Sequence, residues 1–405
     1  MKRSFSFAAV RTTALLASGT GLIAATYGLV RLAYGLFLPD VQADLSFGST
    51  TAGLISAGAS LLYCAGAVLG FFTAAQHPRR LVVGATATAT LGAAGMAGSQ
   101  HTATFAVFAI VGSAGAGLAS PGLVSIVRRH VTDGAVDRGQ AIVNAGTGPG
   151  LVAAGLLALA LLPDWRAAWS VVAVFTLLIG VALLLLDRPR AHLASDDGAG
   201  LPSWSWFSDH RHLVAAAFLM GAGSAAVWNF GRTVLVDAGA SDEISVLAWT
   251  ALGIGGTAVI GTARPMSLLH PRTAWIVTSL AITIASAVFG LAPGSTIVAL
   301  VACGAFGWGY TAATGALIAW TTRIDAARAS AGTSLLFVIL IAGQAVGATA
   351  VGILLPAGPG VAFVFAAAAT LASTVAAIAS VTRERPRDDR GRRPSDRRRR
   401  SSPAR

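Results

Sequence analysis

The stretch YGLVRLAYGLFLPDVQAD, residues 27–44, is apolar and carries one arginine, Arg31, well inside it. In an α-helix, Tyr27, Arg31 and Tyr34 are spaced at i, i+4 and i+7, so they share one helix face. A charge within a membrane span is costly and normally faces the protein interior or a water-filled cavity. The stretch therefore predicts a membrane helix whose polar face lines the inside of a helical bundle.

The composition of the whole chain indicates an all-α integral membrane protein. Hydrophobic residues make up 55% of the 405 residues, charged residues only 11%, and the mean hydropathy is +0.70. Ordinary soluble domains carry about a quarter charged residues. The apolar runs have the length of membrane-spanning helices, about 20 residues, and lack the alternation of barrel strands.

Twelve apolar segments are long enough to span a membrane. The first follows a basic start that resembles a secretory signal, but its apolar run is too long for a signal core, so we expect an uncleaved helix. One long connection, at 187–211, separates the sixth span from the seventh. The predicted spans are 13–38, 50–73, 80–99, 103–127, 139–162, 167–187, 212–236, 244–263, 273–292, 296–321, 329–355 and 359–382.

The basic residues predict the orientation. Every second connection, together with the two ends of the chain, holds 26 of the 29 Lys and Arg residues. The opposite connections hold only Arg166, while Arg31 and Arg232 lie within spans. Because basic loops face the cytoplasm, we expect both termini to be cytoplasmic. This pattern fits a multi-pass protein of a bacterial inner (plasma) membrane.

The long central connection and a weak internal repeat predict two pseudo-symmetric six-helix bundles. Tyr27 and Arg31 in the first span are echoed by Trp228 and Arg232 in the seventh, and the glycine pattern of the fifth span returns in the eleventh. Parallel halves of this kind are typical of rocking transporters. We predict an N-terminal bundle at 1–187, a cytoplasmic linker at 188–211, a C-terminal bundle at 212–382 and a disordered Arg-rich cytoplasmic tail at 383–405.

The segments outside the spans predict lipid contacts rather than nucleic-acid binding. Trp204, Trp206 and Phe207 in the linker are expected to form a short amphipathic piece at the membrane interface. The tail holds eleven Arg and four acidic residues, or +7 of the net charge of +12, and should be drawn to anionic lipid headgroups. The remaining +5 is spread over short loops, so we expect no nucleic-acid partner.

The connection between the second and third spans reads Gly70-FFTAAQHP-Arg79-Arg80. It resembles the glycine- and arginine-containing loop motif of the major facilitator superfamily of membrane transporters. Ala74 stands where that motif has an aspartate, which puts the gating interaction of the loop in doubt. The resemblance implies a gating or structural role for Gly70, Arg79 and Arg80, and for the chain the major facilitator fold.

The fifth span is similar to the glycine–proline helix of the same superfamily. Gly146 and Gly150 allow close backbone approach, and Pro149 can kink the helix. Within the superfamily, the first span resembles the YbfB/YjiJ-like family, which implies transport but no defined substrate. That resemblance rests on Tyr27-Gly28, Arg31, Tyr34, Leu38-Pro39 and Asp44-Leu45.

The substrate site is expected around Arg31. A guanidinium fork suits a carboxylate or a phosphate; the alternative is a structural arginine paired with an acid such as Asp40. Arg232 could assist in binding, or it could extend to lipid headgroups. The other candidates carry polar atoms that need partners in a cavity or in interhelical packing: Tyr27, Tyr34, Tyr63, Trp228, Asn229, Tyr310 and Gln344.

The titratable residues limit the mode of transport. None of the 17 acidic residues and none of the seven histidines lies in the interior of a predicted span; all of them fall in loops or beside loops, with Asp187 and His212 at the ends of the spans at 167–187 and 212–236. This disfavours proton symport through a midplane carboxylate and organic cations as substrates. Uniport, anion exchange and coupling through an acid at the rim stay open. No nucleotide, metal or hydrolytic motif is visible, so we expect no cofactor, no metal and no enzymatic activity; Cys64 and Cys303 are expected to be packing residues.

These observations predict a monomeric secondary or facilitative transporter that moves a small solute, preferably an organic anion, by alternating access. One alternative is an exporter of hydrophobic or drug-like compounds in which Arg31 is structural. Another is a membrane sensor with a transporter fold, which would signal through the linker or the tail.

Overall fold

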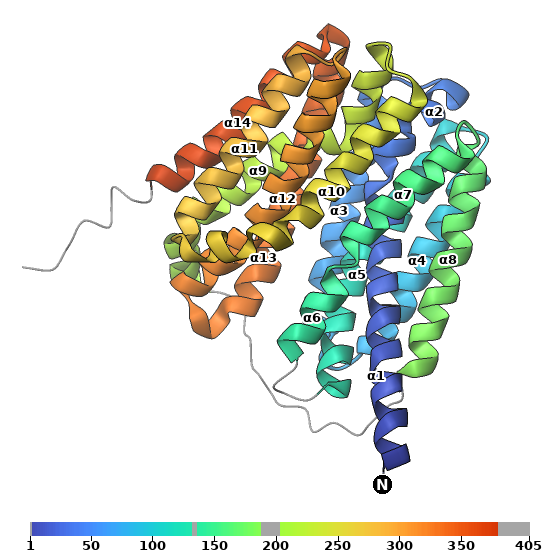
Figure 1. Ribbon diagram of the computed structural model, residues 1–405, viewed down its shortest axis with the longest axis vertical. Coiled ribbons are helices and arrows are strands. Elements are labelled where there is room, and N and C mark those ends of the chain that lie inside the picture. Colours follow the sequence, from blue (N-terminus) through green and yellow to red (C-terminus); the bar gives the residue numbers. More distant parts are fainter. Residues whose placement is uncertain (1, 132–135, 188–202, 380–405) are drawn as a thin grey trace, which may run out of the picture.

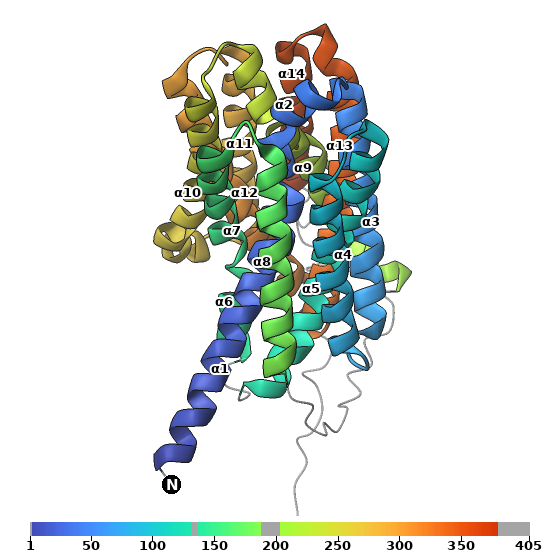
Figure 2. The same ribbon diagram turned by 90° about the vertical axis from the view of Figure 1, so that its right-hand side faces the viewer.

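The computed structural model describes residues 2–131, 136–187 and 203–379, and every regular element in these ranges is a helix. The predicted tail at 383–405 and residues 188–202 of the predicted linker lie outside the described residues. The helices form two groups that lie side by side (Figure 1). We call the end of the molecule at which the chain begins basal and the opposite end apical (Figure 2).

The first group contains the helices up to residue 186. In it, α4 packs against α5 and α8, and α3 packs against α5. The elements are α1 (Lys2–Ile23), the π-helix η1 (Ala24–Leu32), α2 (Tyr34–Leu45), α3 (Ser49–Thr73), α4 (Pro78–Ala97), α5 (Thr102–His130), α6 (Val136–Asn144), α7 (Thr147–Leu161) and α8 (Trp165–Leu186).

The second group begins at residue 204. In it, α11 packs against α12 and α14, and α9 packs against α13 and α14. The elements are α9 (Trp204–Asp237), α10 (Asp242–Leu268), α11 (Pro271–Leu291), α12 (Thr296–Ile324), the 3₁₀ turn η3 (Ala326–Arg328), α13 (Ala329–Leu354), the 3₁₀ turn η4 (Leu355–Ala357) and α14 (Pro359–Ala379).

Eleven helical segments of the described chain are long and apolar enough to cross a membrane. Large apolar side chains remain exposed on them, for example Ile260, Leu268 and Leu291 at 78%, 81% and 76%. Such faces are expected of helices that contact lipid rather than water. The predicted span at 80–99 corresponds to α4, which does not reach this level of apolarity because its 20 residues include two Arg and three Thr.

Glycines set the closest helix contacts in both groups. A Cβ added at Gly150 of α7 would lie 2.5 Å from the carbonyl oxygen of Ala24 in η1, and one added at Gly146 would meet the carbonyl of Thr20. In the second group, a Cβ added at Gly347 of α13 would lie even closer to the carbonyl oxygen of Ala222 in α9. The glycine echo in the sequence therefore corresponds to the same type of small-residue helix packing in both groups.

The predicted span at 139–162 is interrupted. Helix α6 ends at Asn144, and α7 begins at Thr147. Pro149 has no N–H to donate to Ala145, and its ring crowds that carbonyl, so an α-helix cannot run undisturbed through this point. The break between α6 and α7 thus lies just before Pro149, while the structural or gating role of Pro149 stays a prediction.

Helix α9 begins at Trp204, eight residues before the predicted start of its span, with Ser203 as its N-cap. Trp206 is 3% exposed and stacks on His210, with ring centroids 3.7 Å apart. The prediction of an interfacial piece is thus wrong for Trp206, although Trp204 is 90% exposed. The expectation that every histidine lies in or beside a loop is wrong for His210, which is buried in α9 and bonds Thr321 through Nε2 at 3.1 Å.

Candidate functional site

The centre of the first long helix is a π-helix, η1, rather than an α-helix. Its hydrogen bonds join residues five apart, as from the Ala33 N–H to the Gly28 carbonyl at 3.0 Å. π-Helical turns are rare and frequently occur at functional sites. The prediction that Tyr27, Arg31 and Tyr34 share one face assumed a continuous α-helix, so it holds only in part. Tyr27 and Arg31 both contact α3 in its middle, while the hydroxyl of Tyr34 donates to the Ala52 carbonyl near its apical end at 3.0 Å.

Arg31 is a partly buried cation whose only hydrogen-bond partner among the described residues is a neutral amide. Its Nη2 donates to Oε1 of Gln344 at 2.9 Å, and its Cζ lies 4.9 Å from the ring centroid of Tyr63. Its Nε is buried without a partner. No carboxylate pairs with Arg31 in the part of the chain that the structure describes, and Asp40, the acid considered for this role, pairs with Arg232 instead.

The side chains around Arg31 form a connected polar network. Nε2 of Gln344 donates to the hydroxyl of Tyr310 at 3.0 Å and to Oγ of Ser224 at 3.3 Å. The hydroxyls of Tyr27 and Tyr63 lie 2.8 Å apart. Because η1 and α3 belong to the first group and α13 to the second, the Arg31–Gln344 bond joins the two groups.

A small cavity of about 30 Å³ lies beside this network. A cavity of about 10–15 Å³ already holds one water molecule, whereas small-molecule sites typically measure about 300–1,000 Å³. The described conformation is therefore closed around the site, and a substrate requires the helices to separate. Five of the predicted site residues line the cavity, namely Arg31, Tyr34, Trp228, Asn229 and Gln344, and Tyr27, Tyr63 and Tyr310 adjoin it through the contacts above.

Three serines in the cavity wall were not predicted. Ser56 donates to Oδ1 of Asn229 at 2.6 Å, which is a second bond between the groups. Ser60 and Ser113 also line the cavity, and the hydroxyl of Ser113 is buried without a partner. Serine is common in membrane helices, where its hydroxyl usually bonds the backbone of its own helix, so the sequence offered no signal for these positions.

The apolar part of the site is formed by aromatic rings of the second group. The ring centroid of Trp228 lies 5.9 Å from that of Trp249, 5.8 Å from Phe306 and 5.3 Å from Tyr310. The indole nitrogens of Trp228 and Trp249 are buried without a hydrogen-bond partner. The rings around Trp228 are therefore packed edge to face, and Trp228 itself lines the cavity with its indole donor unused.

Arg232 lies apart from the cavity, at the apical contact between the groups. It is 1% exposed and forms ion pairs with Asp40 of α2 and with Asp242 of α10, the latter at 2.7 Å. It also donates to the Leu36 carbonyl at 2.7 Å and to Ser245 at 3.0 Å. The alternative that it extends to lipid headgroups is wrong, because its guanidinium is enclosed by protein groups.

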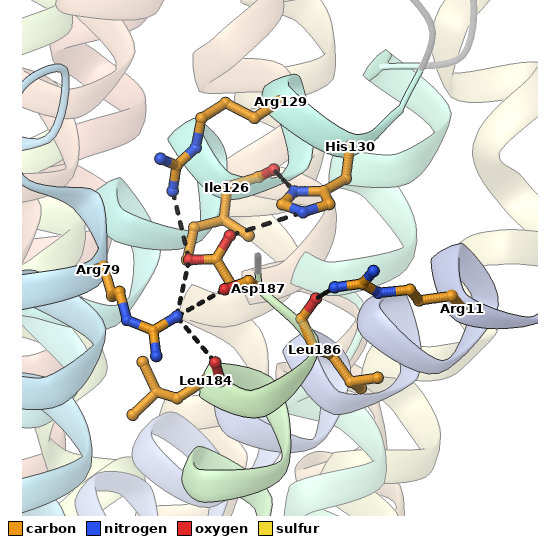
Figure 3. A network of polar contacts seen from close by, with 8 residues as sticks. All are labelled: Arg11, Arg79, Ile126, Arg129, His130, Leu184, Leu186 and Asp187. Carbon is orange, nitrogen blue, oxygen red and sulfur yellow. Dashed lines mark hydrogen bonds and ion pairs between the residues drawn. The ribbon is translucent and has the colours of Figure 1, made fainter. Parts of the chain in front are cut away.

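A second polar network occupies the basal end of the first group (Figure 3). Asp187, directly after α8, has a side chain that is 1% exposed, and it forms ion pairs with Arg79 at 3.6 Å and with Arg129 at 3.4 Å. Nε2 of His130 lies 3.6 Å from its other oxygen. Arg79 also donates to the carbonyls of Asp187 and Leu184 at the end of α8, at 2.6 and 2.8 Å.

In this basal network the carboxylate beside Arg79 is that of Asp187, while residue 74 of the loop is an alanine. Asp187 stands at the end of the predicted span at 167–187, and its role was not predicted. Of the other predicted gating residues, Gly70 packs against Pro121, where an added Cβ would come within 2.6 Å of the ring, and Arg80 is exposed. Their gating roles stay predictions.

The described residues contain no group of three or more His, Cys, Asp or Glu side chains that could hold a metal ion. Both cysteines are free. Cys303 is buried in α12, and the thiol of Cys64 donates to the Val338 carbonyl at 3.5 Å.

With this geometry in hand, comparison with known proteins identifies the family. The sequence model of the Major Facilitator Superfamily matches residues 20–319. The chain belongs to this superfamily. It is thus a transporter of the major facilitator type and a multi-pass membrane protein. No protein of curated function matches the sequence.

Solved structures of superfamily transporters share the fold at low sequence identity. The nucleoside transporter NupG is 13% identical in sequence to this chain. The two structures align with a TM-score of 0.73 over 92% of this chain and 99% of NupG. A D-xylose–proton symporter is 14% identical and aligns with a TM-score of 0.71 over 91% of this chain and 96% of the symporter. A POT family transporter in complex with 5-aminolevulinic acid is 13% identical and aligns with a TM-score of 0.74 over 92% of this chain and 95% of that transporter. At these identities the likeness shows the fold alone.

Proposed function

We propose that this chain is a secondary or facilitative transporter that moves a small organic anion across the membrane and binds it at Arg31. The observation that carries the proposal is the charge balance at Arg31. Its guanidinium lies within the helical bundle, its only hydrogen-bond partner in the described chain is the neutral amide of Gln344, and one of its donors is unpaired. A buried charge is costly unless it is compensated, so the site favours a ligand that brings a negative charge.

The walls of the cavity suit the uncharged part of such a ligand. The ring of Trp228 offers apolar contact, and the hydroxyl of Ser113 and the indole nitrogen of Trp228 offer hydrogen bonds. Arg31, Tyr27, Tyr34, Tyr63, Trp228, Asn229, Tyr310 and Gln344 form the proposed substrate site. Arg232 is better suited to a gate than to the substrate site, since its donors are occupied by carboxylates, a carbonyl and a serine.

Transport then proceeds by alternating access between the two helix groups, taken as six-helix bundles at 1–187 and 212–382. In the described part of the chain, the hydrogen bonds between the two groups lie at the level of the bond between Cys64 and the Val338 carbonyl or closer to the apical end. Toward the basal end the helices of the groups diverge (Figure 1). In this scheme the described conformation is closed at the apical end, and the Arg232–Asp40 pair is the apical gate.

We further propose twelve spans with both termini cytoplasmic, so the basal end faces the cytoplasm. The inclusion of α4 among the spans rests on its position between α5 and α8, and the orientation rests on the basic residues of the basal loops. The chain is proposed to be a monomer of a bacterial inner membrane, of the YbfB/YjiJ-like type. Its tail at 383–405 would contact anionic headgroups.

A second candidate function is export of hydrophobic compounds, and the aromatic cluster around Trp228 favours it. In that case Arg31 would hold the bundle together through Gln344 and would not contact the substrate. The two functions differ in what they require of the ligand: an anionic group for the first, apolar surface alone for the second.

A thermal-stability screen of the purified protein separates these functions. The probes are benzoate, lactate, gluconate, inorganic phosphate, glucose and tetraphenylphosphonium, each with the wild-type chain, Arg31→Ala and Arg31→Lys. A ligand at 100 times its Kd stabilises the folded state by about 2.7 kcal/mol. Anion-specific stabilisation that is lost in Arg31→Ala supports the proposal, whereas stabilisation by the lipophilic cation alone, equal in all three proteins, favours the exporter.

A further inference from the structure

The side chain of Gln344 is held in one orientation. It lies on α13 and is 4% exposed. Its Nε2 donates to Ser224, whose own hydroxyl proton is committed to the Gly221 carbonyl at 2.9 Å, and to the hydroxyl of Tyr310. With its nitrogen fixed in this way, the amide presents its oxygen to Arg31.

The amide uses only half of the binding edge of Arg31. Nε and Nη2 of a guanidinium lie on one edge of its plane and together can receive the two oxygens of one carboxylate. Here Nη2 donates to Oε1 of Gln344, while the neighbouring Nε is buried without a partner. A carboxamide has one acceptor oxygen, whereas a carboxylate has two and carries the charge that the site lacks.

We propose that the Gln344 carboxamide is an internal competitor of the substrate: it occupies the anion subsite on Arg31 in the empty protein, and a monocarboxylate displaces it. This inference rests on the proposed function. A planar carboxylate matches the shape of the group that it replaces. Its single negative charge matches the single cationic side chain of the described cavity wall, while a phosphate dianion would leave one charge uncompensated.

The exchange would also link binding to movement. Arg31 belongs to the first helix group and Gln344 to the second, so the internal bond holds the groups together. A substrate that takes over Nη2 removes this bond from the interface. The anion binds more tightly to the state in which the groups are separated at the site, because in that state it does not compete with Gln344. Substrate binding therefore shifts the equilibrium toward this separated state.

The direction of the effect of a Gln344 substitution distinguishes a competitor from a wall residue. Gln344→Met keeps the length of the side chain and removes the amide. A competitor predicts that the half-saturating concentration of benzoate or lactate falls about tenfold or more, because the hydrogen bond from the charged guanidinium to the amide no longer has to be broken. A wall residue that binds the substrate predicts a rise. Ser49→Ala is the matched control, since it also removes a hydrogen bond between the groups, to the Gly352 carbonyl at 3.1 Å, but does not touch Arg31, so no fall is expected.

Gln344→Glu gives a second, ligand-independent test in the full-length protein. It places a carboxylate on Arg31 from within, so the empty protein should unfold at a higher temperature than the wild type, and this gain should vanish in Arg31→Ala/Gln344→Glu. In the Gln344→Glu single variant, the concentration of a monocarboxylate that gives half of the maximal stabilisation should rise at least tenfold. Phosphate and methanesulfonate are the contrasting probes and should bind less well than the carboxylates to the wild type.

The outcomes separate the inference from the function on which it rests. If carboxylates bind through Arg31 but Gln344→Met weakens them, or Gln344→Glu binds them as the wild type does, the competitor is overturned and the anion site stands. If phosphate or methanesulfonate binds best, the carboxylate class is overturned. If no anion stabilises the wild type, both the function and the inference fail.

Discussion

Arg232 of α9 and Asp40 of α2 form an ion pair that joins the two helix groups at their apical ends. The guanidinium is 0% exposed and the Asp40 side chain 11%, and the second carboxylate, Asp242, is 57% exposed. Removing one partner of a buried ion pair is strongly destabilising because it leaves an uncompensated charge. This pair therefore contributes more to the apical contact than an exposed pair would.

Asp40→Asn should open the apical contact more often. The substitution keeps the shape of the side chain and removes the charge facing Arg232, so the closed state loses stability relative to the open one. The measurement is the labelling rate of Ser56→Cys by a water-soluble maleimide, in a chain with Cys64 and Cys303 replaced by serine. Ser56 is 7% exposed and bonds Asn229 across the interface in the described conformation. The rate should rise severalfold.

Asp242→Asn is the matched control for this experiment, because it also removes a carboxylate from Arg232 but at an exposed position. Its effect on the labelling rate should be clearly smaller. Equal rates in the Asp40→Asn protein and the wild type would show that the ion pair does not control apical access.

Asp187→Asn should destabilise the first helix group. Its buried carboxylate is shared by Arg79 and Arg129, and both lose their anionic partner in the variant. Breaking a buried ion pair by removing one partner costs about 3–5 kcal/mol, and the exposure of Arg79 places the expected effect at the lower end. Thermal unfolding of the purified protein measures it. Arg80→Gln is the control, because Arg80 is exposed and lies next to Arg79 on α4. Its unfolding temperature should be nearly unchanged. An equal fall of the unfolding temperature in both variants would contradict a specific role for Asp187.

Gly150→Ala should be poorly tolerated. The added Cβ would lie 2.5 Å from the carbonyl oxygen of Ala24 and 2.9 Å from its Cα, both backbone atoms that cannot move aside without shifting η1. Overpacking of this kind costs about 1–3 kcal/mol. Gly261→Ala, where nothing lies within 4 Å of the added atom, is the control and should be neutral or slightly stabilising. Similar unfolding temperatures for the two variants would mean that α7 and η1 can separate freely.

Much of the fold was predictable from the sequence because the membrane imposes a strong pattern. Long apolar runs gave the helices, and the glycines of α7 and α13 gave their close packing against η1 and α9. Features that depend on tertiary contacts were missed. The π-helix is one, since AATYGLVRL reads as ordinary α-helix; the early start of α9 is another, because its first turns are anchored by burial of Trp206 against His210.

The candidate site was predictable in its residue types but not in its connections. Arg31, Trp228, Asn229 and Gln344 stood out as polar or amphipathic residues within spans, and all four line the cavity. Which acid pairs with which arginine depends on how α2 and α9 meet, so the pairing of Asp40 with Arg232 rather than with Arg31 could not be derived. The partners of Asp187 on α4 and α5 could not be derived either, because they depend on how the ends of these helices meet the end of α8.

The most direct test of anion transport at Arg31 is flux in proteoliposomes loaded with wild-type protein, Arg31→Ala or Arg31→Lys. Radiolabelled benzoate, lactate and gluconate are measured against glucose and tetraphenylphosphonium, with folding of each variant checked by its unfolding temperature. We expect the wild type to transport at least one of the carboxylates and Arg31→Ala to transport none while remaining folded. Arg31→Lys should transport the same carboxylate more slowly, because a lysine cannot form the bidentate contact with a carboxylate. Carboxylate flux that persists in folded Arg31→Ala, or flux of the lipophilic cation alone, would contradict anion transport at Arg31.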